Sequence, residues 1–348
     1  MTERSEGNLT ISIAMATYNG EAFIEQQLSS IAEQTYAPSE LVISDDGSSD
    51  RTVNILTAFA HEAPWPVRIQ RRASRLGYSE NFIHTVSRCQ CEIVALADQD
   101  DVWMPNKVDR CVQEFRAAPH VALVHHASAV IAPSGVRTDE TLGPARTRVV
   151  PHLQVRTYVA PLGHALVFKR RLATGANSAR RPQSRMGGGL MTHDEWIHFL
   201  GFCAGPVAEL AEPLVLHRRH DANTSIVRRD GLGARIGRVD PQRHRDQLRY
   251  ASSCDQENAE FVASMMRAED TADIAGPLGE ASVFFRARSE LLASRAALSS
   301  LGRGRRTAGV VRLLLKGAYR VGAPLGPRAL MRDMAGMIER RVEDEPDE

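Results

Sequence analysis

The sequence predicts an α/β fold in which a mostly parallel sheet is flanked by helices. Short apolar runs of the kind that form buried strands alternate four times with segments of helical periodicity. A polar cluster directly follows three of these runs, as expected where the strands of a parallel sheet end at one edge. Hydrophobic residues make up 43% of the 348 positions, which is enough for a full core.

The individual elements follow from periodicity and from turn residues. Strands are expected at residues 11–15, 41–44, 67–69 and 93–97, and again at 163–168 and 213–216. One helix is expected at residues 21–34. Three others are expected to begin at a cap formed by Ser49 or Asp50, at a cap formed by Ser79, and at Pro105. The strand at 93–97 is apolar throughout, which suits a strand buried on both faces.

Three carboxylates, Asp98, Asp100 and Asp101, follow the strand at residues 93–97. Like charges in one cluster repel unless a cation or several donors neutralise them, and oxygen ligands suit Mg²⁺ or Mn²⁺. The alternative is a solvated acidic loop ahead of a helix. The polar clusters at residues 17–20 and 45–50 are expected to meet these acids at the same sheet edge.

Two other ways of binding a nucleotide are excluded by motif. The first strand is followed by T-Y-N-G-E-A and not by the G-x-G-x-x-G of dinucleotide-binding folds. The chain has no G-x-x-x-x-G-K-[ST] loop, which also disfavours a phosphotransferase. A metal held by carboxylates is the simplest remaining way to hold a diphosphate.

Charge, cysteine content and hydropathy favour a cytoplasmic protein. The formal net charge of +1 argues against extended nucleic-acid binding, and five cysteines without paired metal spacing suggest reduced thiols. Residues 1–8, expected to be a disordered lead, lack an apolar signal core, and no run of about 20 apolar residues occurs. Any membrane contact is therefore expected to be peripheral, on the inner face of the plasma membrane.

Six segments between residues 9 and 225 occur in an order and spacing typical of one enzyme family. They are A-T-Y-N-G-E-A-F-I-E-Q-Q-L-S-S-I-A-E-Q-T (16–35), S-D-D-G-S-S-D-R-T (44–52), L-G-Y-S-E-N-F (76–82), A-D-Q-D-D-V-W-M-P-N-K (97–107), T-H-D-E-W (192–196) and R-R-H-D-A-N-T-S (218–225). Together they resemble family-2 glycosyltransferases of the Rossmann-like GT-A fold, and most of all the bacterial rhamnosyltransferase-like members. The resemblance implies a GT-A domain over residues 9–230, with a nucleotide-sugar half at about 9–117 and an acceptor half at about 118–230.

The same resemblance implies a donor site and a metal site at matching positions. The residues implied to bind the donor are Thr17, Tyr18, Asn19, Asp46, Asp98 and Arg219, with Asp46 accepting from a pyrimidine N–H. The residues implied to hold Mn²⁺ or Mg²⁺ are Asp98, Asp100 and His220. Taken as single residues, Asp46 also suits a plain turn, His220 a partly buried loop histidine and Arg219 a solvated charge.

Asp194 lies where the family places its catalytic base. A carboxylate there would take the proton of the acceptor hydroxyl, and attack opposite the leaving group inverts the anomeric carbon. The adjacent Glu195 is an alternative base, and residues 192–195 also suit an ordinary helix start. Acceptor contacts are expected from His164, Trp196 and Glu195.

These features predict an inverting, metal-dependent glycosyltransferase. Its donor would be a nucleoside diphosphate sugar such as dTDP-rhamnose or a UDP-sugar, and its acceptor a lipid-linked cell-surface or cell-wall glycan. The alternatives are a transferase for a small soluble acceptor and a non-catalytic nucleotide-sugar-binding protein of the same fold. The presence of Asp98, Asp100 and Asp194 together speaks against the non-catalytic alternative.

The segment at residues 231–348 has a helical pattern rich in arginine and alanine, so a helical C-terminal extension is expected. Its residues 303–320 contain no acid, and four basic side chains share one side of a helix: Arg305, Arg312, Lys316 and Arg320. Apolar residues cover the opposite side. Such a basic amphipathic helix can lie on an anionic membrane surface, or it can pack on the sheet domain with its basic face in solvent.

Overall fold

A computed structural model describes residues 9–154, 160–186, 189–221, 223, 241–298, 301 and 303–315. The chain forms two compact units. The first unit comprises Met1–Arg181, Leu190–Ile226 and Met265–Pro277, and the second comprises Pro182–Gly189, Val227–Ser264 and Leu278–Glu348. The lead expected at residues 1–8 lies outside the described residues.

The first unit contains a sheet in which the first four strands of the chain are parallel, as predicted. Its strands are β1 (Ile11–Thr17), β2 (Glu40–Asp45), β3 (Val67–Arg71) and β4 (Ile93–Ala97), ordered β3-β2-β1-β4. Every neighbouring pair among these four strands is parallel. Their carboxyl ends therefore lie at one edge.

Beyond β4 the sheet is mixed. The further strands are β9 (Leu166–Lys169), β6 (Leu123–Ile131), β10 (Val207–Arg218) and β5 (Val102–Trp103), with β7 (Arg137–Leu142) on β6 and β8 (Arg148–Val150) on β10. Strand β9 runs antiparallel to both β4 and β6, whereas β10 is parallel to β6. The strand expected at residues 163–168 is shorter than predicted, because residues 163–165 form a 3-10 turn, η1.

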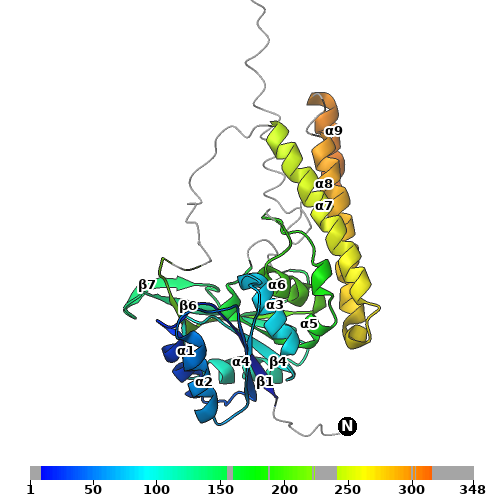
Figure 1. Ribbon diagram of the computed structural model, residues 1–348. Coiled ribbons are helices and arrows are strands. Elements are labelled where there is room, and N and C mark those ends of the chain that lie inside the picture. The colour runs from blue at the N-terminus through cyan, green and yellow to red at the C-terminus, as the bar shows by residue number, and fades with distance from the viewer. Residues whose placement is uncertain are drawn as a thin grey trace, which may run out of the picture. The chain divides into compact units, whose positions relative to one another are not determined.

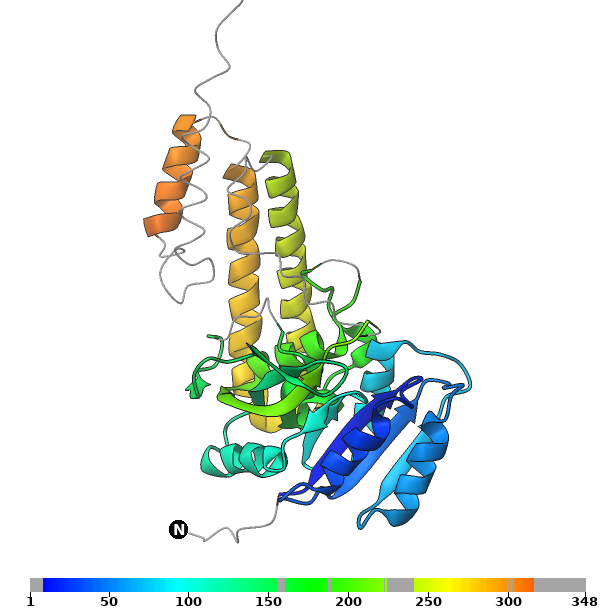
Figure 2. The ribbon, with the colours of Figure 1, turned by 90° about the vertical axis from the view of Figure 1, so that its left-hand side faces the viewer.

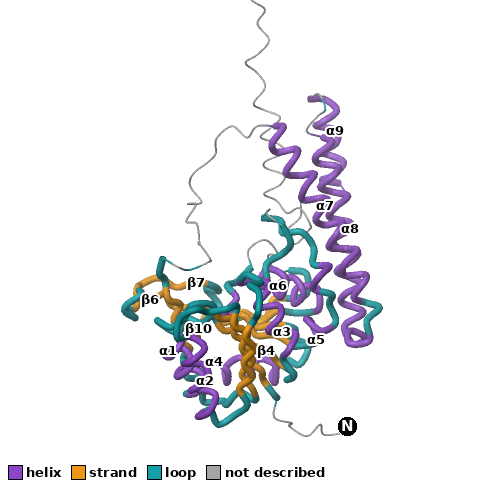
Figure 3. Tube along the Cα trace, in the orientation of Figure 1, coloured by secondary structure: helices purple, strands orange, loops and turns teal. Residues whose placement is uncertain are grey.

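Helices cover both faces of this sheet (Figures 1 and 3). The helices α1 (Ile24–Ala32), α2 (Thr52–Glu62) and α4 (Lys107–Ala117) contribute apolar side chains to one large core with the strands. The helices α3 (Tyr78–Arg88), α5 (Arg171–Thr174) and α6 (His193–Ala204) pack together, and α3 and α6 contact the strands. The predicted α/β architecture is confirmed.

The two expected helix caps differ in outcome: Asp50 bonds to the start of its helix from two residues before it, whereas Ser79 bonds to another element. Helix α2 begins at Thr52, and the Asp50 carboxylate accepts from the Thr52 and Glu21 backbone N–H groups at 3.0 and 3.1 Å. Helix α3 begins at Tyr78 after Gly77, whose φ of 84° lies in the left-handed region that glycine tolerates. The Ser79 hydroxyl instead accepts the His193 N–H at 2.8 Å, which ties α3 to the start of α6.

The second unit is helical, as predicted for the C-terminal segment. It holds most of α7 (Pro241–Met265) and α8 (Ala275–Leu298), together with α9 (Arg303–Leu315). Figure 2 shows α7 and α8 side by side, and Leu248, Leu292 and Ala296 form a small apolar core with them. None of the helices in the described ranges combines the length and the apolarity needed to cross a membrane.

Helix α9 confirms a helix within the expected basic amphipathic segment. Val310 and Leu313 are buried, while Arg305 and Arg312 are exposed. Three apolar side chains are nevertheless exposed on this helix: Val311, Leu314 and Leu315. The remaining basic residues of the prediction, Lys316 and Arg320, lie outside the described residues.

Candidate active site

The three polar clusters meet at the carboxyl ends of β1, β2 and β4, as the sequence predicts. The Tyr18 N–H donates to Gln99 Oε1 at 2.9 Å, and Gln99 Nε2 returns a bond to the Tyr18 carbonyl at 3.0 Å. Thr17 Oγ1 donates to Asp45 Oδ2 at 3.0 Å, and the Asn19 N–H donates to Ser48 Oγ at 2.9 Å. These bonds join loops that are 28 to 81 residues apart in the chain.

Asp46 is buried at this edge and holds a neighbouring loop. Its two carboxylate oxygens accept the N–H groups of Leu76 and Gly77 at 2.7 and 2.9 Å. Arg75 lies between Asp46, 3.8 Å away, and the Tyr18 ring, whose centroid is 3.7 Å from the guanidinium carbon. Each carboxylate oxygen has a second lone pair, so these bonds leave Asp46 able to accept from a nucleobase. Its donor-binding role stays a prediction.

The three acids after β4 form one cluster, with Asp98, Asp100 and Asp101 each offering an oxygen within 4.8 Å of the others. Asp101 is fully buried, and burial alone would raise the pKa of its carboxyl group. The rings of His164 and His217, each with Nδ1 3.0 Å from an Asp101 oxygen, instead hold that pKa well below its usual range. Asp101 therefore stays ionised inside the protein.

Sequence analysis did not assign His217 or the buried role of Asp101. His217 stands in β10, and its contact with Asp101 spans 116 residues of sequence. The Arg218 backbone N–H adds a third bond to Asp101 at 3.0 Å. The only sequence feature that pointed here was the run H-R-R-H at residues 217–220, which follows an apolar strand.

Asp100 and His220, both expected at the metal, lie next to each other. His220 Nε2 is 2.8 Å from Asp100 Oδ2, and the His220 ring packs on Phe23 with centroids 4.9 Å apart. Burial, followed by the Asp101 and Asp98 carboxylates, raises the pKa of Asp100 to about 6 against the opposing effect of His220. A bound cation would offset both the burial of Asp100 and its repulsion by the neighbouring carboxylates.

The two arginines at the end of β10, Arg218 and Arg219, both bond within the protein. Arg219, expected to bind the donor, makes a paired contact with Glu140 of β7 at 2.6 and 2.9 Å. Arg218 is buried and donates to the Asp100 carbonyl at 2.9 Å. Arg218 thus ties the acidic loop to β10, and the donor-binding role of Arg219 stays a prediction.

Helix α6 begins with a capping box that separates the roles of Asp194 and Glu195. Glu195 Oε2 accepts the Thr192 N–H at 3.0 Å, and the Thr192 hydroxyl oxygen accepts the Glu195 backbone N–H. Asp194 Oδ1 accepts the Glu195 N–H at 3.0 Å and the Thr192 hydroxyl. Residues 192–195 thus form a helix start, as the alternative interpretation expected. The capping box uses the side chain of Glu195, whereas Asp194 is half-buried beside it.

Two of the expected acceptor contacts are inconsistent with burial. His164 and Trp196 are each only 1% exposed, so neither side chain offers a face to an acceptor. Trp196 belongs to α6 and is buried, with Arg181 5.9 Å from its ring centroid. His164 Nε2 is 2.8 Å from Ser128 Oγ, and its Nδ1 faces the carboxylates after β4.

His193, the residue before Asp194, is buried among aromatic side chains. Its ring stacks on Phe82 at a centroid distance of 4.3 Å and meets the Tyr78 ring edge-on at 5.9 Å. Burial lowers the pKa of His193, and the carboxylates of Asp194 and Asp98 act on the same ring in the opposite sense. The ring also lies against Gly163, the residue before His164, whose Nδ1 contacts Asp98.

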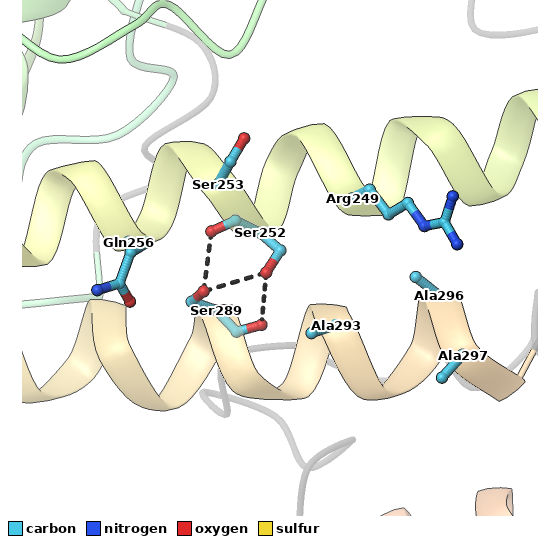
Figure 4. A pocket seen from close by; sticks show the side chains of 8 residues that line it. All are labelled: Arg249, Ser252, Ser253, Gln256, Ser289, Ala293, Ala296 and Ala297. Atoms are coloured by element: carbon cyan, nitrogen blue, oxygen red, sulfur yellow. Dashed lines mark hydrogen bonds between the residues drawn. The ribbon is translucent and has the colours of Figure 1, made fainter.

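The second unit contains a groove whose lining differs from the acidic edge of the sheet. This groove of about 500 Å³ lies between α7 and α8. Ser252 and Ser289 exchange hydrogen bonds of 2.9 and 2.8 Å there (Figure 4). Its lining consists of serine, alanine and glutamine side chains with Arg249. It contains no carboxylate, so it cannot supply a base or a hard metal site.

The sheet topology and the acidic edge together define a GT-A-type glycosyltransferase fold. Residues 12–150 match the family model "Glycosyl transferase family 2". Residues 12–150 thus match a family-2 glycosyltransferase domain, which agrees with the resemblance drawn from the motifs.

Individual relatives agree with this assignment. The chain is 36% identical over 102 residues to the dTDP-rhamnosyl transferase RfbG of Shigella flexneri, covering 28% of this chain and 35% of that protein. It is 31% identical over 118 residues to an uncharacterised glycosyltransferase of Nostoc, covering 34% of this chain and 36% of that protein. The matches thus span about a third of those relatives' own length.

A solved structure shares the fold. The TarS fragment 1–349 of S. aureus, in complex with UDP-GlcNAc, superposes with a TM-score of 0.52 at 14% identity, over 89% of this chain and 93% of that chain.

Proposed function

We propose that this protein is an inverting, metal-dependent glycosyltransferase that takes its sugar from a nucleoside diphosphate donor. The proposal rests on two sets of carboxylates, one for a metal and one for a base. Asp98 and Asp100 gather at the end of β4, and Asp194 stands at the start of α6, where the preceding His193 ring lies against Gly163 of the η1 turn. A diphosphate leaving group and an acceptor hydroxyl need these two kinds of group on opposite sides of a sugar.

The donor set suits Mn²⁺ or Mg²⁺. Asp98 and Asp100 would hold the cation with carboxylate oxygens, and His220, 2.8 Å from Asp100, would add a nitrogen that favours Mn²⁺. A bound divalent cation neutralises the charge that develops on a departing diphosphate. The raised pKa of Asp100 supports this assignment, because the carboxylates repel one another without a counter-charge.

Asp194 is the general base of this proposal. Glu195 is used in the capping box, whereas Asp194 shows no hydrogen bond to its second oxygen within the described part of the chain. A single base acting on the acceptor hydroxyl, opposite the leaving group, gives inversion without a covalent intermediate.

The donor we propose is a dTDP- or UDP-linked sugar, and the acceptor a lipid-linked cell-surface or cell-wall glycan. The likeness to the dTDP-rhamnosyl transferase of Shigella supports the first of these donors. Tyr18, Asn19 and Asp46 line the edge at which the nucleotide would bind. A transferase for a small soluble acceptor would use the same residues and differ only in its acceptor.

We also propose a cytoplasmic protein that binds the inner face of the plasma membrane peripherally. Helix α9 supports this, because Arg305 and Arg312 are exposed beside the apolar Val311, Leu314 and Leu315. A lipid-linked acceptor would be reached from such a surface.

The test is donor hydrolysis by the purified protein with a panel of nucleotide sugars, with and without Mn²⁺. We expect one nucleotide class to be hydrolysed, and activity to disappear in excess chelator. Full activity in chelator would exclude the metal, and binding without turnover of any donor, with every acceptor tried, would favour the non-catalytic alternative.

His220→Ala measures the histidine's part in the metal site. We expect it to weaken the response to Mn²⁺ more than the response to Mg²⁺, because imidazole suits the softer ion. Equal responses in wild type and variant would mean that His220 only packs on Phe23.

A further inference from the structure

His164 is surrounded by polar partners although it is buried. Its Nδ1 lies 3.3 Å from Asp98 Oδ2 and 3.0 Å from Asp101 Oδ2. Its Nε2 lies 2.8 Å from Ser128 Oγ on β6. The ring stacks on His217 with centroids 4.7 Å apart and an interplanar angle of 27°.

The backbone at His164 is fixed as well as its ring. The buried Lys107 of α4 donates from Nζ to the His164 carbonyl at 2.8 Å, and the lysine ammonium lies over the Trp103 ring at 3.5 Å. Gly163, just before it, leaves room for the His193 ring, since a Cβ there would stand 2.7 Å from His193 Nε2. The η1 turn therefore holds His164 at one position relative to β4.

The two carboxylates that share Nδ1 differ in what else they contact. Asp101 has His217 Nδ1 and the Arg218 N–H as further partners, and it is 0% exposed. The Asp98 side chain is 30% exposed, and His164 provides the one side-chain hydrogen bond recorded for it among the described residues. His164 is thus a bridge from an anchored, buried carboxylate to a partly exposed one.

We propose that His164 is a positioning residue that sets the orientation of Asp98 for the cation. This inference rests on the proposed function, in which Asp98 binds the metal. Since a carboxylate only accepts, Nδ1 carries the proton, and its N–H directs one Asp98 oxygen inward. The other Asp98 oxygen is then turned toward the exposed side, and outer partners of this kind typically change metal affinity by about 10- to 100-fold.

Two substitutions separate this role from simple packing. In His164→Asn the amide nitrogen falls near the place of Nδ1 and can still donate to Asp98. In His164→Gln the amide nitrogen falls near the place of Nε2, so the contact with Ser128 survives and the contact with Asp98 is lost. Both changes remove the ring and its stack on His217.

The measurement is Mn²⁺ affinity of the full-length protein without donor, by calorimetry or by the spin-resonance signal of free Mn²⁺, together with the thermal unfolding midpoint. We expect His164→Gln to weaken Mn²⁺ binding by about 10-fold or more and His164→Asn to stay within about threefold of wild type. If His164→Gln does not fold, Ser128→Ala, which frees Nε2 and loosens the ring, should weaken binding several-fold.

The outcomes are distinct. Wild-type affinity in His164→Gln, or equal loss in both variants, overturns the positioning role and leaves the metal site intact. A wild-type protein that binds no Mn²⁺ overturns the metal dependence of the proposed function itself, and this inference with it.

Discussion

At the residue scale, Asp194 and Glu195 are neighbours with different surroundings. Asp194→Asn keeps the size and hydrogen-bonding shape of the side chain but removes its basicity. Because a base acts in the transition state, kcat should fall by about 10²- to 10⁴-fold while donor affinity stays near wild type. Steady-state kinetics and a separate nucleotide-binding titration measure the two effects.

Glu195→Gln is the matched control, because glutamine also completes a capping box. We expect near-wild-type turnover from it. The reverse result, an active Asp194→Asn and a dead Glu195→Gln, would move the base by one residue. Loss of nucleotide binding in Asp194→Asn would make that residue a donor contact and not a base.

The acidic cluster predicts a pH dependence of metal binding. Burial and the Asp101 and Asp98 carboxylates raise the pKa of Asp100 to about 6, so below that pH the group carries a proton that a metal must displace. Mn²⁺ affinity should therefore rise with pH up to about 6 and level off above it. Titrations across this range test the slope, and an affinity independent of pH would show that Asp100 is not a ligand.

Individual residues show where sequence analysis succeeds and where it stops. The cluster of acids after a buried strand was visible in the sequence, because three carboxylates stand within four positions. Which of them is buried was not visible in the sequence. The burial of Asp101 depends on its contacts with His164 and His217, which are 63 and 116 residues away along the chain. For the same reason His164 looked like an acceptor contact until its burial was known.

At the element scale, the start of α6 should couple stability to the proposed catalytic role of Asp194. Thr192→Ala removes the hydroxyl of the capping box, which should cost about 1 kcal/mol of stability. The same hydroxyl donates to Asp194, so kcat should also fall, whereas Thr192→Ser should restore both. Thermal unfolding and kcat of the two variants test this, and a stable, fully active Thr192→Ala would contradict it.

The four parallel strands were predictable because each is a short apolar run with its own turn residues. The caps were not, since the Ser79 hydroxyl bonds to the start of α6, and the Asp50 carboxylate divides its bonds between Thr52 of α2 and Glu21. The position of β9 between β4 and β6 was also hidden. A strand of four residues gives no local indication of which neighbours it joins, or that both contacts are antiparallel.

At the scale of the whole molecule, the proposed membrane binding depends on α9. Basic residues near an anionic surface contribute roughly 1 kcal/mol each, so reversing Arg305, Arg306 and Arg312 to glutamate should weaken binding to anionic vesicles by at least about 100-fold. The control reverses three exposed arginines outside α9, Arg243, Arg267 and Arg286, and so gives the same net charge. Vesicle sedimentation at low and high salt measures both, and wild-type binding should weaken as salt screens the charges. Equal loss in both triple variants would indicate a general charge effect, and no binding by the wild type would mean that the basic face of α9 is only solvated.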